Sequence, residues 1–204
     1  QPSNFEETWE IKGSIKLHKL TKNNVSPQEP KNFVVIINPI RPRQLWVDQD
    51  IKSLTNHTEI IKKNNLPSSW LISYDNLFDG EIIDVLKSLN QDQEVGAFLE
   101  VSEKLATDSK VSYKVADGDY YRPDKVFLPG YSPQDRIRII KTYFKQFELT
   151  FSKKPLVVGA WYIDPLSLNN LASLGVKSSI VVSDQYDTDA ARVWGQYFAF
   201  PYFP

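Results

Sequence analysis

The chain of 204 residues contains no cysteine and no methionine, and only two histidines. Without cysteine it can form no disulfide, no thiolate metal site and no thiol nucleophile. Because it does not begin at an initiator methionine, we expect that a signal peptide or other sequence preceded Gln1. That start and the lack of cysteine together favour an extracellular or cell-surface location.

Long apolar runs and an excess of one charge are also missing. No apolar stretch approaches the roughly 20 residues of a membrane helix, and the formal net charge is −1. We therefore expect no membrane span in this chain and no nucleic-acid partner, since its overall charge attracts no anionic polymer. Phosphate-binding loops, dinucleotide fingerprints and nucleophile elbows are absent as well.

What the chain does contain is a repeated pattern, in which a strand-like apolar run leads into an acidic residue. Apolar runs of this kind are typical of strands covered on both faces. The four segments are 70–75 (WLISYD), 95–100 (VGAFLE), 156–164 (LVVGAWYID) and 179–184 (SIVVSD). A fifth run, 33–38 (FVVIIN), ends in an amide. Carboxylates at these positions indicate an α/β enzyme face, because sites in such folds lie where the strands end.

Helical patterns separate the strands, and their alternation predicts a parallel sheet with right-handed crossovers. Ser132 followed by Pro133 is a helix-start signal, and Gly175 is a left-handed helix terminator. Five strands are too few to close an eight-stranded barrel. We therefore predict an α/β fold, an incomplete (β/α) barrel with about five core parallel strands and helices outside. Residues 1–31 are expected to form a strand or hairpin extension and a linker, and residues 32–204 a barrel domain truncated at its C-terminus.

Two stretches carry a family resemblance. Residues 94–102, EVGAFLEVS, look like the strand that bears the paired metal histidines of the polysaccharide deacetylase (NodB-like) superfamily. Residues 157–176, VVGAWYIDPLSLNNLASLGV, look like its strand and helix with the Arg-Pro-x-Gly motif. The resemblance covers roughly residues 33–190 in layout. It implies an incomplete (β/α)7 barrel, shared with glycoside-hydrolase relatives, of which this chain would be a fragment.

The metal ligands of that family are missing from this chain. Where the first strand of the family ends in a metal-binding and catalytic Asp pair, this chain has Asn38-Pro39. Its third strand needs two histidines four apart, and none follows Phe98; the two present, His18 and His57, fall elsewhere. We therefore expect no zinc-dependent deacetylation, no metal and no cofactor.

The strand-end acids are the catalytic candidates. We predict Glu100 paired with Asp164 or Asp184, because two carboxylates across a cleft supply the acid and base, or acid and nucleophile, of glycoside hydrolysis. Each has a plainer interpretation. Glu100, of a type rarely buried without a reason, could form a salt bridge. Asp164 before Pro165 is an ordinary helix N-cap, and Asp184 carries the same ambiguity.

Residues near the same strand ends are candidates for substrate binding, because flat rings with polar edges suit sugars and arginine could bind an anionic sugar. They are Arg41, Trp46, Asp75, Trp161 and Tyr186. Arg41 could also pair with the strand-end acids. The plainer interpretations are core packing of the aromatic residues, a helix cap at Asp75 and a solvated surface arginine. Three aspartates after the last strand also resemble a hard-cation loop, although their spacing is not that of a calcium hand: Asp184, Asp187 and Asp189.

The sequence thus predicts a carbohydrate-active domain with a polysaccharide or oligosaccharide as its partner. The first hypothesis is a metal-independent glycoside hydrolase that uses the strand-end carboxylates. The alternative, from a different functional class, is a non-catalytic barrel that binds a glycan or a protein and has lost the deacetylase metal site.

Overall fold

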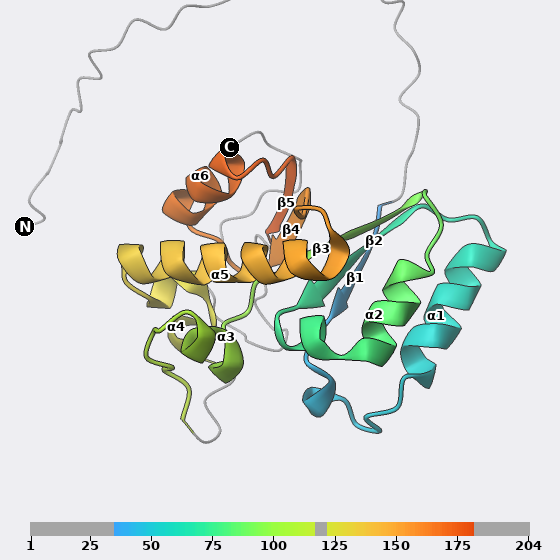
Figure 1. Cartoon of the computed structure of the whole chain (residues 1–204), viewed down its shortest axis with the longest axis horizontal. Helices are drawn as coiled ribbons and strands as arrows, with labels where there is room; N and C mark the ends of the chain where they lie inside the picture. The colour runs from blue at the N-terminus through green and yellow to red at the C-terminus, as the bar shows by residue number, and fades with distance from the viewer. Residues whose placement is uncertain (1–34, 117–121, 182–204) are drawn as a thin grey trace, which may run out of the picture. The chain divides into compact units, whose positions relative to one another are not determined.

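The structure, a computed structural model, describes residues 35–116 and 122–181 (Figure 1). The predicted extension at 1–31, Asp184 and Tyr186 lie outside the described residues, so the division at residue 32 stays a prediction. No helix in the described part of the chain is long and apolar enough to cross a membrane.

In the described part of the chain five parallel strands form one sheet, and they neighbour one another in the order in which they occur in the chain. They are β1 Ile36–Ile40, β2 Ser68–Ser73, β3 Gln93–Phe98, β4 Val157–Ala160 and β5 Ser178–Val181. Because the order never reverses, right-handed crossovers bring every connecting helix to the same face of the sheet. This is the winding of a (β/α) barrel rather than of a doubly wound sheet, in which the strand order reverses at a switch point. The predicted incomplete (β/α) barrel is confirmed.

Six α-helices and three short 3-10 turns join the described strands (Figure 1). The helices are α1 Lys52–Lys63, α2 Gly80–Lys87, α3 Glu103–Asp108, α4 Pro123–Val126, α5 Pro133–Phe151 and α6 Pro165–Ser173. The turns are η1 Arg43–Leu45, η2 Asp75–Phe78 and η4 Leu128–Gly130. Helix α5 packs against α3 and α6, and α1 lies beside α2, where Lys62 Nζ donates to the carbonyl of Ser88 at 3.2 Å.

The helix boundaries follow from capping chemistry. Ser132 Oγ accepts a hydrogen bond from the Asp135 amide at the start of α5, as the Ser-Pro signal predicts. After α6, Gly175 has a φ of +98°, which confirms the predicted left-handed terminator. Helix α1 begins at Lys52, where the side chain of Asp50 accepts a hydrogen bond from the Lys52 amide at 2.9 Å.

The main hydrophobic core lies between the sheet and the helices. Its members alternate along the strands with residues of the opposite face, as the two-residue period of a strand requires. The strands supply Trp70, Ile72, Val95, Ala97, Leu99, Val158 and Ala160, and the helices supply Leu54, Ile61, Ile82, Leu86, Ile139, Ile140, Phe144 and Phe147. On α5, Ile139 is fully buried, whereas Ile137 is half-buried.

Leu71 occupies the other face of the sheet and explains two glycines on the neighbouring strands. A Cβ at Gly159 would lie 2.4 Å from Leu71 Cδ1, and one at Gly96 would lie 2.8 Å from Leu71 Cδ2 and 2.3 Å from the carbonyl oxygen of Val157. All three contacts are shorter than van der Waals distance. The close approach of Leu71 and β4 therefore requires glycine at these two positions.

The end of the first strand differs from the sequence prediction. Strand β1 continues to Ile40, so Asn38 lies inside it and is buried, with its Nδ2 donating to the Ser69 carbonyl at 3.3 Å. Pro39 is tolerated because β1 pairs with only one described strand, β2, and a proline lacks the N–H that a second neighbour would need. The residue that follows the strand is Arg41, and the interpretation of Asn38 as the strand-end residue is wrong.

Candidate functional site

Four residues at the carboxyl ends of the strands form a polar rim. The rim consists of Arg41 after β1, Ser73 at the end of β2, Glu100 after β3 and Trp161 after β4. The sheet register explains their proximity, because Ser73 pairs with Phe98 and Phe98 pairs with Gly159. Parallel strands in this register bring their ends to a single edge. The structure thus brings together three of the residues predicted from sequence, namely Arg41, Glu100 and Trp161.

Glu100 is the centre of the rim, and both of its carboxylate oxygens accept hydrogen bonds. Arg41 Nε donates to Oε2 at 3.0 Å, and Trp161 Nε1 donates to Oε1 at 3.1 Å. The Glu100 side chain is 11% accessible and the Arg41 side chain 38% accessible. The plainer interpretation of Glu100, a salt bridge, is therefore observed. A partly buried carboxylate between a guanidinium and an indole N–H is held in one position by charge-assisted hydrogen bonds.

Arg41 and Trp161 each keep surface that a ligand could contact. Among the described residues, the hydrogen bonds of the Arg41 guanidinium involve only its Nε, so its terminal nitrogens remain as donors. Trp161 is half-buried, and its ring meets Phe98 edge-on at 5.5 Å and 83°. It also packs against Val126 and Phe127. The indole is thus fixed by packing on one side and by Glu100 at its nitrogen.

Two acceptor atoms at the end of β2 have no hydrogen-bond partner within the described part of the chain. They are Ser73 Oγ and Asp75 Oδ2, both buried. The other oxygen of Asp75 accepts from Gln44 Nε2 at 3.4 Å. A buried polar atom without a partner costs about 1–3 kcal/mol. Neither atom is accessible to solvent, so neither is a contact for a ligand in this structure.

Asp164 is buried, and both of its carboxylate oxygens accept hydrogen bonds from within the fold. Its Oδ1 accepts from the Ser167 amide at 3.0 Å and from Arg136 Nη1 at 2.9 Å, and its Oδ2 accepts from Ser167 Oγ at 2.6 Å. The residue is 6% exposed. Arg136 also donates to the carbonyls of Tyr131 and Pro129. Asp164 is the N-cap of α6, as its plainer interpretation predicts, and it joins that helix to α5.

The two arginines that follow β1 have different partners. Arg43 pairs with Asp79 at 3.1 Å and with Glu81 at 2.5 Å, and hydrogen bonds to Glu81 and Asp79 raise the pKa of its guanidinium. Asp79 is the N-cap of α2. Arg43 therefore fastens the loop after β1 to α2, whereas Arg41 belongs to the rim.

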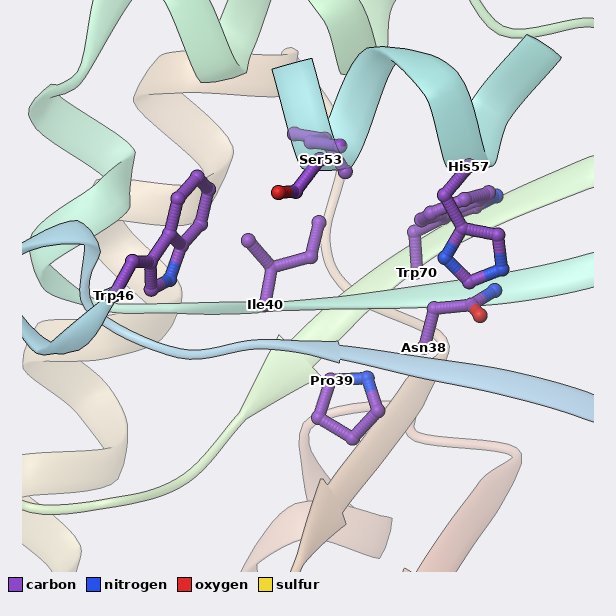
Figure 2. A pocket seen from close by; sticks show the side chains of 8 residues that line it. Asn38, Pro39, Ile40, Trp46, Ser53, His57 and Trp70 are labelled. Atoms are coloured by element: carbon purple, nitrogen blue, oxygen red, sulfur yellow. The ribbon is translucent and has the colours of Figure 1, made fainter. Parts of the chain in front are cut away.

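Trp46, the remaining predicted sugar-binding residue, lines a separate cavity between β1 and α1 (Figure 2). Its Nε1 donates to the Arg41 carbonyl at 2.9 Å, which places the indole next to the rim. The cavity has a volume of about 170 Å³ and is lined by Asn38, Pro39, Ile40, Trp46, Ser53, Leu54, His57 and Trp70. Sequence reasoning did not identify Ser53 or His57, although their spacing of four on one helix was a signal that they share a face.

The described residues do not fit the metal that the family resemblance implies. No three side chains of His, Cys, Asp or Glu in the described part of the chain are grouped so that they could hold an ion. Asn38 faces the cavity by α1, and His57 packs edge-on against Trp70 at 5.1 Å there, away from Glu100. An amide and one imidazole on the helix side cannot replace the paired aspartates and histidines of a strand-end zinc site.

No protein-family model matches the chain, and no curated protein matches it. Among solved structures the chain is similar to a CE4 family pseudoenzyme from Bacillus anthracis in its wild-type form, with 12% identity and a TM-score of 0.45. The similar region covers 74% of this chain and 44% of that one. A mutant described as having restored enzymatic activity gives the same identity and TM-score, with 46% of that chain covered. This chain thus spans less than half the length of those structures. The similarity concerns the path of the chain alone and does not extend to activity.

Proposed function

We propose that this domain binds a polysaccharide or oligosaccharide at the strand-end rim and does not hydrolyse it. The observation that carries the proposal is that the predicted acids Glu100 and Asp164 are both occupied by hydrogen bonds within the fold. Glu100 is engaged by Arg41 and Trp161, and Asp164 by Arg136 and Ser167. Glycoside hydrolysis needs one carboxyl to deliver a proton and another to act as base or nucleophile. Neither of these acids has an oxygen without a hydrogen-bond donor.

The chemistry of the rim suits recognition of a sugar. The accessible terminal nitrogens of Arg41 are donors for ring or carboxylate oxygens. The indole of Trp161 provides a flat apolar surface that is already fixed in position, so little conformational entropy is lost on binding. The deacetylase resemblance of the sequence supports carbohydrate as the ligand class, and an extracellular or cell-surface location belongs to the same proposal.

A glycan array that contains neutral and uronic-acid polysaccharides tests the proposal. We expect the full chain to bind at least one glycan, and Trp161→Ala and Arg41→Ala each to weaken that binding tenfold or more. Arg138→Ala is the matched control, because Arg138 pairs with Asp135 on the exposed surface of α5. Trp161→Phe separates the flat ring from its hydrogen bond with Glu100 and should keep most of the binding. Circular dichroism spectra verify that each variant is folded.

Hydrolysis by Glu100 is the second candidate, since a carboxylate held by two donors is also well placed to stabilise positive charge on a sugar. Release of reducing ends from the bound glycan decides between the two. We expect no release by the unmodified chain. Release that disappears in Glu100→Gln would establish the hydrolase and overturn the binding proposal. The absence of any array signal would overturn both.

A further inference from the structure

We infer that the cavity between β1 and α1 is a second binding site, which takes a single neutral sugar ring. Its size fits one ring. The volume is about 170 Å³, and an apolar cavity of about 150 Å³ in a protein accepts benzene. Its mouth is open on the side of α1, since Ser53 and His57 are exposed. Nothing larger than a monosaccharide unit fits inside.

The walls select a neutral ligand. No side chain of Asp, Glu, Lys or Arg is among the eight lining residues, so a charged group would be desolvated without a counter-charge. The indole nitrogens are already used, Trp46 Nε1 by the Arg41 carbonyl and Trp70 Nε1 by Gln93 Oε1 at 3.0 Å. The indole of Trp46 is half-buried and presents ring surface, whereas Trp70 is fully buried. The aliphatic side chain of Ile40 lies between the two indoles (Figure 2).

The polar groups of the cavity select a ring that carries hydroxyls. Asn38 Nδ2 donates to Ser69, whereas its Oδ1 has no donor among the described residues. The Ser53 hydroxyl likewise forms no hydrogen bond there, and the imidazole of His57 offers both a donor and an acceptor. Figure 2 shows Asn38 and His57 at one end of the cavity and Ser53 towards its middle. Apolar faces with separated polar groups at the edge match the faces and the hydroxyls of a pyranose.

Titration of the full chain with methyl glycosides of glucose, galactose and mannose, followed by amide NMR shifts, tests the inference. We expect saturable shifts at Ser53 and His57 with a dissociation constant of about 1–10 mM, as for a small ligand with few contacts. Ser53→Phe, which fills the mouth, should weaken binding at least tenfold. Asn56→Phe on the same helix is the matched control, because Asn56 is exposed and does not line the cavity. Asn38→Leu should weaken binding at least fivefold.

Three further ligands define the chemical class. Cyclohexanol, indole and the methyl glycoside of glucuronic acid should each bind at least fivefold more weakly than the best neutral glycoside. Equal binding of any of them would overturn the inference, as would the absence of saturable shifts or unchanged binding in Ser53→Phe. The Arg41→Ala variant should leave the cavity titration unchanged, because Arg41 does not line the cavity and the variant keeps the main-chain carbonyl that accepts from Trp46. The proposal of glycan binding at the rim and the proposal of sugar binding in the cavity can therefore be tested separately.

Discussion

Arg41 Nε lies 3.0 Å from Glu100 Oε2, although 59 positions separate the two residues in the chain. The pair connects the end of β1 to the end of β3 past the intervening β2. Trp161 then extends the connection to β4 through its hydrogen bond with the other oxygen of Glu100. One carboxylate thus ties together three strand ends at the edge where (β/α) folds place their sites.

We expect the Arg41–Glu100 pair to stabilise the fold. Arg41→Ala should lower the free energy of unfolding by about 1–2 kcal/mol, because it removes a positive charge and a hydrogen-bond donor from beside a largely buried carboxylate, while Arg41 itself is partly solvated. Adding Glu100→Gln should recover part of that loss, which gives a coupling energy of about 1 kcal/mol. Urea denaturation of the single and double variants measures it.

Lys153 and Glu94 provide the control for this double-mutant cycle of Arg41 and Glu100. They are also 59 positions apart and 3.3 Å from each other, but their side chains are 47% and 33% accessible. Lys153→Ala should change stability by less than about 0.5 kcal/mol. A coupling energy for Arg41 and Glu100 no larger than that of this exposed pair would show that the rim pair contributes nothing to the fold.

Asp164 should prove essential to stability. Asp164→Ala removes the cap of α6, at about 1 kcal/mol, and leaves Arg136, only 18% accessible, without its partner. We expect a total loss of about 2–4 kcal/mol. Asp164→Asn retains an acceptor for the Ser167 amide and should lose less. Asp79→Ala removes the cap of α2, whose partner Arg43 is more accessible, and should lower the free energy of unfolding by about 1 kcal/mol. An equal loss in Asp164→Ala and Asp79→Ala would contradict this prediction.

The two glycines next to Leu71, Gly96 and Gly159, should differ in how substitution by alanine affects stability. Gly159→Ala places a Cβ against the flexible end of Leu71 and should destabilise by about 1–3 kcal/mol, a loss that Leu71→Ala should remove. Gly96→Ala meets the main-chain oxygen of Val157 and should not be rescued by Leu71→Ala. Gly80→Ala, with nothing within 4 Å, should be neutral or slightly stabilising. Thermal denaturation compares the variants, and rescue of Gly96→Ala by the Leu71 change would contradict the packing described.

Alkaline pH should unfold the domain through buried tyrosines. Burial raises the pKa of Tyr131 to about 12 and that of Tyr143 well above the ordinary value of 10.0. A folded pKa above the unfolded one means that the stabilisation is fully present below about pH 10 and is lost as the pH rises through the folded value. We expect stability to fall between about pH 10 and 12, and Tyr131→Phe to fall less steeply. Tyrosinate absorbance measures the ionisation of the tyrosines. If every tyrosine ionised near pH 10 while the domain stayed folded, the prediction would be contradicted.

The sequence predicted the sheet well because its signals are local. Apolar strands, the cap at Ser132 and the terminator at Gly175 depend on neighbours within a few positions, and each appears where expected. The first strand was predicted less well, because Asn38 and Pro39 look like a strand end when no partner is known. Pairing with β2 carries β1 on to Ile40, and the edge position of β1 accommodates the proline.

The candidate site was predicted as a set of residues but not as a set of contacts. Glu100, Arg41 and Trp161 were each singled out, yet nothing in the sequence specified that they meet. The cavity was not predicted at all, because it arises where α1 crosses β1 and depends on residues of both. The catalytic assignments of Glu100 and Asp164 stay predictions, as does that of Asp184, which lies outside the described residues.

The sequence by itself determined the alternation of strand and helix and placed acids where strands end, since short-range periodicity and capping encode both. Only the tertiary structure decided what those acids do. Asp164 accepts a hydrogen bond from Arg136, which lies 28 positions away in the chain, and Glu100 accepts one from Arg41, which lies 59 positions away. Interactions across such distances depend on the register of the sheet and the packing of α5 and α6, so the partner of a carboxylate is fixed only once the chain is folded.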